Sequence, residues 1–144
     1  MSETLLPARQ KSVRFYDDVI FAVQLEDERI FVPIRQMCEA LGVTYQGQID
    51  RIRRDNVLSK YELQLEVERE QGGGLQVTNC LDLKMVPGWL FGISSRRVRA
   101  EIREKLERYQ ERVYEVIWDA FRNEVEVPER QAPPPVDELE AIAQ

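Results

Sequence analysis

The sequence has no histidine, and only two cysteines occur among its 144 residues. Histidine is the commonest general base and metal ligand, and Cys38 and Cys80 lack both the paired spacing of a zinc site and the density of a disulfide scaffold. The glycines at 72–74 are not followed by the lysine and hydroxyl residue of a P-loop, and no nucleophile elbow is present. We therefore expect a protein that is not an enzyme and holds no metal or cofactor, with both cysteines as reduced core residues.

Long apolar runs are also missing. No segment approaches the roughly 20 apolar residues of a membrane-spanning helix, and the polar first residues do not form a signal-peptide pattern. These absences favour a cytoplasmic protein that makes no membrane contact. The chain, with 43% apolar residues, is long enough for one folded domain, which we place at residues 1–124. Residues 125–144 are acidic and rich in proline, a composition that predicts a disordered tail.

Positive charge is scarce and unevenly distributed in this chain, whose net charge is −6. The tail holds five acidic residues and one arginine, so the folded part is close to neutral. Residues 33–60 hold five basic and three acidic side chains, whereas residues 61–83 hold five acidic side chains and one arginine. The net negative charge disfavours indiscriminate binding to nucleic acid, so any DNA contact should use the locally basic segment.

That basic segment has the pattern of a helical hairpin. Pro33 suits the first position of a helix, and Gly42 lies where a left-handed residue would end it. Thr44 can then cap a second helix, over residues 44–55. Apolar residues recur at helical spacing on both helices: Ile34, Met37, Cys38 and Leu41 on the first, and Tyr45, Ile49 and Ile52 on the second. This layout is typical of a helix-turn-helix.

The polar face of the 44–55 helix carries side chains that DNA recognition uses. Guanidinium groups can bind phosphate or guanine, and glutamine amides can pair with adenine. We therefore predict double-stranded DNA as a partner, bound through Gln46, Gln48, Arg51, Arg53, Arg54 and Lys60. A second basic group could add phosphate contacts: Arg35, Arg96, Arg97 and Arg99. The alternative interpretation is a solvated surface helix, because short helices with several arginines are common.

Two β-rich regions flank the helical hairpin. Residues 13–25 hold two β-rich runs separated by acidic residues, and a third run at 29–32 completes a predicted three-stranded meander. Residues 61–69 and 75–83 surround the glycines at 72–74 and predict a β-hairpin in the position of a wing. Glutamates on this hairpin would be repelled by phosphate. A structural hairpin or a protein-binding edge is therefore as good an interpretation as a wing.

A long amphipathic helix is predicted over about residues 95–123, with Ser94 or Ser95 as its cap. At 1.5 Å per residue it would be roughly 45 Å long, so part of it would project or need a partner, which predicts a homodimer. The expected dimer interface consists of Leu106, Tyr109, Val113, Val116, Ile117, Trp118, Ala120 and Phe121. The alternative is that this stripe packs on the meander of its own chain. Before the helix, Trp89 and Phe91 of an apolar turn segment at 86–93 are expected in the core.

The fold class that follows is α+β: an N-terminal β-meander, a helix-turn-helix-like helical hairpin, a wing-like β-hairpin and a long C-terminal α-helix. Over about residues 12–122 the chain resembles the N-terminal domain of phage antirepressor proteins, which is related to the Bro-N domains. The resemblance rests on an ordered series of segments: residues 13–16, 31–35, 38–42, 48–55, 86–93 and 103–110. It implies a DNA-binding or regulatory module of phage or prophage origin in bacteria, which many relatives join to a further C-terminal domain.

Two hypotheses about function follow. In the first, the protein is a dimeric, non-enzymatic regulator whose 44–55 helix enters the major groove of DNA, with two protomers on two half-sites at the bacterial nucleoid. In the second, it is an antirepressor whose acidic hairpin and tail bind and sequester a repressor or another basic DNA-binding protein. The second hypothesis uses the negative charge of the chain directly.

Overall fold

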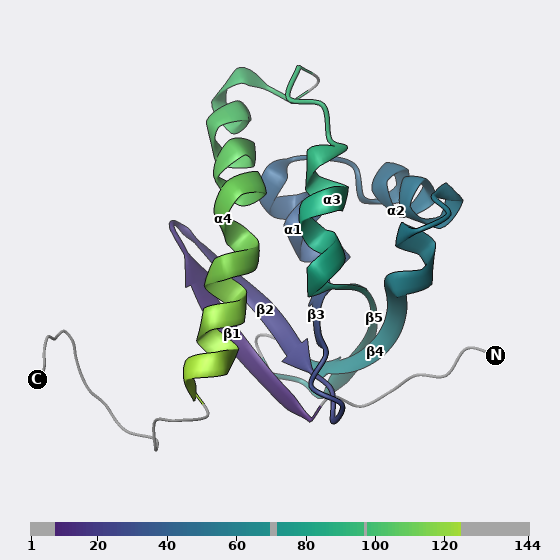
Figure 1. The fold of residues 1–144 in the computed structure, drawn as a ribbon, viewed down its shortest axis with the longest axis vertical. Helices are drawn as coiled ribbons and strands as arrows, with labels where there is room; N and C mark the ends of the chain where they lie inside the picture. The colour runs from purple at the N-terminus through teal and green to yellow at the C-terminus, as the bar shows by residue number, and fades with distance from the viewer. Residues whose placement is uncertain (1–7, 70–71, 97, 125–144) are drawn as a thin grey trace, which may run out of the picture.

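The computed structural model describes residues 8–69, 72–96 and 98–124, and the statements below concern these residues. The fold is α+β, as predicted, with one five-stranded antiparallel sheet in the order β1-β2-β3-β5-β4 (Figure 1). The strands are β1 (Arg9–Phe15), β2 (Asp18–Gln24), β3 (Ile30–Pro33), β4 (Glu62–Glu68) and β5 (Leu75–Asp82). The helices are α1 (Ile34–Leu41), α2 (Tyr45–Arg54), α3 (Val86–Phe91) and α4 (Ala100–Glu124), with short 3-10 helices η1 (Leu58–Tyr61) and η2 (Leu83–Met85).

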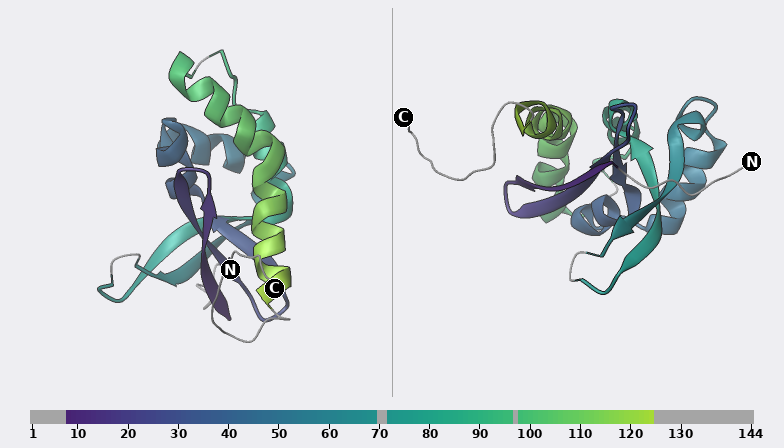
Figure 2. Two further views of the ribbon diagram at one scale, coloured as in Figure 1. Left: turned by 90° about the vertical axis from the view of Figure 1, so that its left-hand side faces the viewer. Right: turned by 90° about the horizontal axis from the view of Figure 1, so that it is seen from below.

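The predicted meander and hairpin both form, and they belong to the same sheet. β1 pairs with β2 along its length, and β3 pairs with both β2 and β5. β5 contacts β3 only through Cys80, Leu81 and Asp82, so its first residues pair with β4 alone. The β4–β5 hairpin is therefore anchored in the sheet at one end, and its other end projects from the body of the protein as a two-stranded ribbon (Figure 2).

The two faces of the sheet support different apolar clusters, because neighbouring residues in a strand point to opposite faces. On one face, Val32 and Leu81 join the main core with residues of all four α-helices. On the other, Phe31 and Cys80 join a smaller cluster with Leu65 of β4. The larger cluster fixes the positions of the helices that carry the candidate functional residues.

The segment at 86–93 forms the helix α3 rather than the expected apolar turn. Trp89 is fully buried, which confirms half of the prediction made for its two aromatic residues. Phe91 is 64% exposed, so its assignment to the core was wrong. Residues two positions apart on a helix point about 200° away from each other, so both side chains cannot face the same core.

The helical hairpin forms as predicted, with α1 and α2 on either side of Gly42. Gly42 has a φ of 69°, the left-handed conformation expected of a residue that ends a helix. Thr44 precedes α2, as expected, but its side chain makes no capping hydrogen bond. Ile49 and Ile52 are buried in the main core, which leaves the polar positions of α2 toward the surface.

Helix α4 begins at Ala100, later than the residue 95 predicted. The hydroxyl of Ser94 accepts a hydrogen bond from the backbone N–H of Arg96 (3.3 Å), and the first helical bond of α4 runs from the N–H of Arg103 to the carbonyl of Arg99. Ser94 therefore belongs to a turn before the helix. The sequence could not distinguish a turn from a helix cap at this position, because the serine hydroxyl accepts a hydrogen bond from a nearby backbone N–H in both.

Most of the predicted dimer interface on α4 lies inside the protomer. Five of its side chains are 2% exposed or less, because α4 packs along the sheet: Leu106, Tyr109, Val113, Ile117 and Phe121. Val116 and Ala120 are half-buried against the same core. The five buried residues are corrected to core positions, since a side chain buried in one protomer cannot contact another, whereas Val116 and Ala120 keep part of their surface exposed. Trp118 alone from that set is well exposed, at 40%.

Both cysteines are buried free thiols, as predicted. Burial raises the pKa of Cys38 to about 12, so the thiol stays protonated and unreactive at neutral pH. Among the described residues, no helix is long and apolar enough to cross a membrane. The predicted tail at 125–144 and the side chain of Arg97 fall outside the described residues.

Candidate nucleic-acid interface

Arg51, assigned to DNA from the sequence, is held against α3. Its Nη2 donates a hydrogen bond to the carbonyl of Trp89 (2.6 Å), and its Nε donates a longer one to Oε1 of Gln48 (3.3 Å). The guanidinium lies on Gly92, where a Cβ atom would overlap it. Burial lowers the pKa of Arg51, and no described carboxylate forms an ion pair with it. Arg51 is therefore a half-buried cation that joins α2 to α3 and still contributes positive potential to its surroundings.

Gln48, one turn before Arg51, makes a second bond between the same two helices. Its Oε1 accepts a hydrogen bond from the indole Nε1 of Trp89 (2.9 Å). A buried indole N–H needs an acceptor, so this contact satisfies Trp89 in the core. The amide of Gln48 is thus oriented by the protein rather than presented outward as a free reader of adenine.

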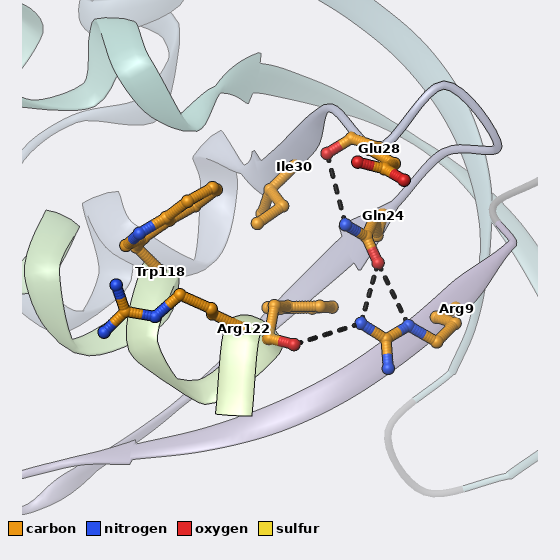
Figure 3. Close-up of a pocket in the computed structure, with 7 residues that line it drawn as sticks. Arg9, Gln24, Glu28, Ile30, Trp118 and Arg122 are labelled. Carbon is orange, nitrogen blue, oxygen red and sulfur yellow. Dashed lines mark hydrogen bonds between the residues drawn. The ribbon is translucent and has the colours of Figure 1, made fainter. Parts of the chain in front are cut away.

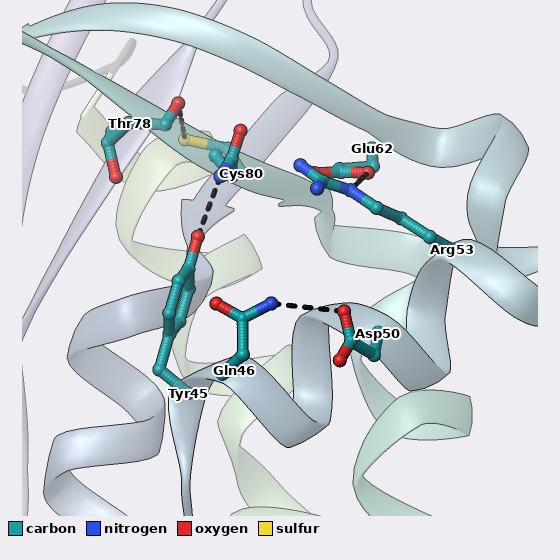
Figure 4. Close-up of polar contacts among 8 residues, drawn as sticks. Tyr45, Gln46, Asp50, Arg53, Glu62, Thr78 and Cys80 are labelled. Carbon is teal, nitrogen blue, oxygen red and sulfur yellow. Dashed lines mark hydrogen bonds and ion pairs between the residues drawn. The ribbon is translucent and has the colours of Figure 1, made fainter.

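Arg53 and Gln46 also have partners within the chain, as Figure 4 shows. Arg53 donates through Nε and Nη2 to the two carboxylate oxygens of Glu62 (3.2 and 2.9 Å). This two-bond contact raises the pKa of Arg53. Gln46 donates to Asp50 at the surface of α2 (3.0 Å). The face of α2 that the sequence assigned to base contacts is therefore largely occupied by intramolecular hydrogen bonds.

The remaining predicted residues differ in whether their side chains have partners among the described residues. Arg54 and Lys60 are exposed, and neither side chain has a hydrogen bond or ion pair with another described residue. Arg35 is exposed but lies over the ring of Tyr45, with its Cζ 4.0 Å from the ring centroid. The hydroxyl of Tyr45 accepts a hydrogen bond from Asn79 of β5 (2.6 Å). Arg35 thus covers the contact between α2 and the hairpin.

A cleft opens between the start of α2 and the segment before α4. We call it the basic cleft, and it is lined by Gly42, Val43, Thr44, Gly47, Gln48, Arg51, Gly92, Ile93, Ser94, Val98 and Arg99. It encloses about 930 Å³. Two segments far apart in the sequence therefore meet here, and each contributes an arginine.

The electrostatics of the basic cleft favour an anion. The side chain of Arg99 is 72% exposed and has only a long ion pair, 3.5 Å, to Glu101. Arg96 is exposed on the turn beside it, and the Nε of Arg103 donates to the carbonyl of Ser95 (2.9 Å), which fixes this turn against α4. Because Thr44 makes no cap bond, the first N–H groups of α2 also remain available in the cleft.

A second cavity lies at the other end of α4, between that helix and the meander (Figure 3). It encloses about 630 Å³ and is lined by Arg9, Gln24, Glu28, Ile30, Trp118, Phe121 and Arg122. Arg9 donates to Oε1 of Gln24 (3.0 and 2.8 Å) and to the carbonyl of Phe121 (3.3 Å). The sequence prediction missed Arg9, because only the register of β1 with β2 places it opposite Gln24.

Residues 11–126 match the P22_AR N-terminal domain. No curated protein and no solved structure matches the chain.

Proposed function

The chain belongs to the P22_AR N-terminal domain family of phage antirepressors, and on this basis we propose that it is a phage regulatory protein that binds double-stranded DNA through the basic cleft. The family is one of regulatory domains and not a known enzyme family. The observation that carries the proposal is the meeting of Arg99, Arg51 and the open start of α2 in one cleft. Each of these groups attracts phosphate.

The contacts divide into two roles. Gln48 and Arg51 position α2 against α3, while the exposed cations Arg54, Arg96 and Arg99 make the phosphate contacts. Lys60, beyond the end of α2, is also exposed and adds a phosphate contact. Gly47 on the first turn of α2 has no side chain, so the helix backbone can approach the DNA closely. Base contact is then limited to Gln46, whose amide is exposed and bonded only to Asp50.

The test is fluorescence anisotropy of a labelled DNA duplex with two charge-reversed variants. Arg99→Glu places a negative charge in the basic cleft and should weaken binding by about tenfold or more, because an attraction becomes a repulsion. Arg112→Glu is the matched control, since Arg112 is also exposed but lies on α4, well beyond the cleft. Equal effects of the two variants, or no binding of the wild-type protein at low salt, would overturn the proposal.

We also propose that the protein self-associates through the exposed part of α4. Tyr114 and Trp118 are 39% and 40% exposed and lie one turn apart on the same side of the helix. A dimer formed there would present two basic clefts to DNA at two half-sites, in the cytoplasm and at the nucleoid of the bacterial host. Sedimentation of Trp118→Lys against wild-type protein tests this, and a monomeric wild-type protein at high concentration would contradict it.

Capture of a regulatory protein is the second candidate function. The observation that favours it is a set of aromatic side chains left exposed on α3 and α4: Phe91, Tyr114 and Trp118. Aromatic residues are enriched in protein interfaces, and buried anchors of this type dominate binding energies. In this case the protein keeps a repressor off its operator by binding the repressor. Retention of a repressor on the immobilised protein, with no DNA affinity at low salt, would favour this function over the first.

A further inference from the structure

We propose that the outer edge of β4 docks a basic, extended segment of a partner protein by strand addition. The proposal deepens the second candidate function, because it gives the protein partner a chemistry and a place to bind. Its test contains no DNA, so it can fail or succeed independently of the basic cleft.

The backbone of β4 offers an open edge. β4 is the last strand of the sheet, and the N–H of Arg69 donates to the carbonyl of Gly74 across the hairpin (3.0 Å). Bonding alternates along an antiparallel strand, so the backbone groups of Leu63, Leu65 and Val67 face β5. Those of Gln64 and Glu66 consequently face away from the sheet. No hydrogen bond to these outward groups occurs among the described residues.

One residue of this edge already has a strand-like partner. The N–H of Glu68 donates to Oε1 of Gln10 (3.0 Å), and its carbonyl accepts from Nε2 of the same side chain (3.3 Å). A neighbouring strand would supply the same pair of bonds. Gln10 therefore closes the end of the edge nearest the hairpin tip, and the open part begins at Glu66.

The side chains of this edge select for a basic partner. Glu62, Gln64, Glu66 and Glu68 alternate along β4 and point to the same face. Glu62 is paired with Arg53, but Glu66 and Glu68 form no ion pair with any described residue. On β5, Val77 and Leu75 lie directly opposite these two glutamates, and both are 52% exposed. An added strand with lysine or arginine at alternate positions would complement this acidic and apolar surface.

The glutamates of β4 disfavour the two strands that this chain itself could add at the edge, which are β4 of a second copy and a strand from residues 125–144. Antiparallel pairing of β4 with β4 of a second copy would place acidic side chains opposite one another, and like charges in that position are destabilising. Residues 125–144 hold five acidic residues and one arginine, so they are repelled in the same way. A basic segment of another protein remains as the occupant.

The probe is a seven-residue peptide of alternating lysine and valine, equal in length to β4. Its affinity for the full chain is measured by calorimetry, with a glutamate–valine peptide as the charge control. The double variant Glu66→Lys/Glu68→Lys should weaken binding by about tenfold or more, since both opposing charges become repulsive. Glu104→Lys/Glu111→Lys changes the net charge equally but on exposed positions of α4, and should bind as the wild type does.

Two further readouts separate strand addition from simple charge attraction. Gln64→Pro removes an outward N–H and leaves the charges unchanged, a substitution that edge strands accept, and it should also abolish strand pairing. In wild-type protein the amides of Gln64 and Glu66 should gain protection from hydrogen exchange when the peptide is added. The proposal is overturned by absence of lysine–valine peptide binding, by equal weakening in the two charge-reversed variants, or by protection of these amides at high concentration of the protein alone.

Discussion

The arginines of α2 and those that precede α4 carry the same charge, but their surroundings differ. Arg51 and Arg53 of α2 donate hydrogen bonds to Trp89 and Glu62, whereas Arg96 and Arg99 before α4 are exposed. A guanidinium that is satisfied within the protein stabilises the fold. One that is exposed without a strong partner can bind an external anion. The position of an arginine on a candidate recognition helix therefore does not establish that it contacts DNA.

The largest expected effect is a loss of stability when Trp89, which bonds to Gln48 of α2, is replaced. Trp89→Ala removes a fully buried indole and the hydrogen bond to Gln48, and should lower the free energy of unfolding by about 3–5 kcal/mol. Phe91→Ala is the matched control in the same helix, and its loss should stay within about 0.5 kcal/mol because Phe91 is exposed. Urea denaturation measures both. Similar losses would show that α2 is not held through Trp89.

The next largest expected effect is a loss of stability when the contact between α4 and the sheet is weakened. The hydroxyl of Tyr109 donates to Oδ2 of Asp18 (2.5 Å), and Lys105 forms an ion pair with the same carboxylate (3.2 Å). Tyr109→Phe should cost about 1.5 kcal/mol at neutral pH, as expected for a hydrogen bond to a charged acceptor. Thermal or urea unfolding of the two proteins measures this loss.

The same contact predicts a pH dependence. Burial raises the pKa of Tyr109, and the hydrogen bond and charge of Asp18 raise it further, so the folded protein favours the protonated phenol. The stabilisation is complete below the ordinary tyrosine pKa of about 10 and is lost as the pH rises above it. Wild-type protein should therefore lose stability more steeply than Tyr109→Phe above that pH. Parallel profiles would contradict the assignment.

A smaller effect tests how Arg51 is held without changing any charge. Gly92→Ala places a methyl group where the guanidinium lies, and should lower stability by about 1 kcal/mol by displacing the hydrogen bond to Trp89. Gly88→Ala, within α3 itself, is the control, because open space surrounds that position, and it should be neutral or slightly stabilising. Thermal unfolding of the two variants distinguishes them. Equal behaviour would mean that Arg51 is not fixed by this contact.

The smallest expected effect on stability is that of the exposed cations. Arg96→Ala/Arg99→Ala should change the free energy of unfolding by less than about 0.5 kcal/mol, because neither side chain is buried and Arg99 has only a long surface ion pair. Urea denaturation against wild-type protein checks this. A larger loss would show that these arginines are structural, like Arg51.

Much of the fold followed from local patterns in the sequence. Alternation of apolar residues identified the strands, and helical spacing with Gly42 at the turn identified α1 and α2. The partners of the polar residues did not follow, because they come from distant segments. Arg51 binds a carbonyl 38 positions away, and Gln48 binds an indole 41 positions away. Only the packing of α3 against α2 brings these groups together.

The role of α4 was ambiguous for a similar reason. A stripe at spacings of three and four is expected for a helix that packs on its own sheet and for one that packs on a partner. The contact of Tyr109 with Asp18 decides in favour of the sheet for the buried residues. The sequence contained no signal for it, because the two residues are 91 positions apart.

The salt dependence of DNA binding tests the central distinction between held and exposed arginines most directly. The slope of the logarithm of the binding constant against the logarithm of salt concentration changes by about 0.9 for each phosphate contact. Arg96→Ala/Arg99→Ala should therefore reduce the steepness of the slope by about 1.8. Arg112→Ala/Arg122→Ala, which removes two exposed arginines farther along α4, should leave it unchanged. Equal slopes for the two double variants would contradict the account.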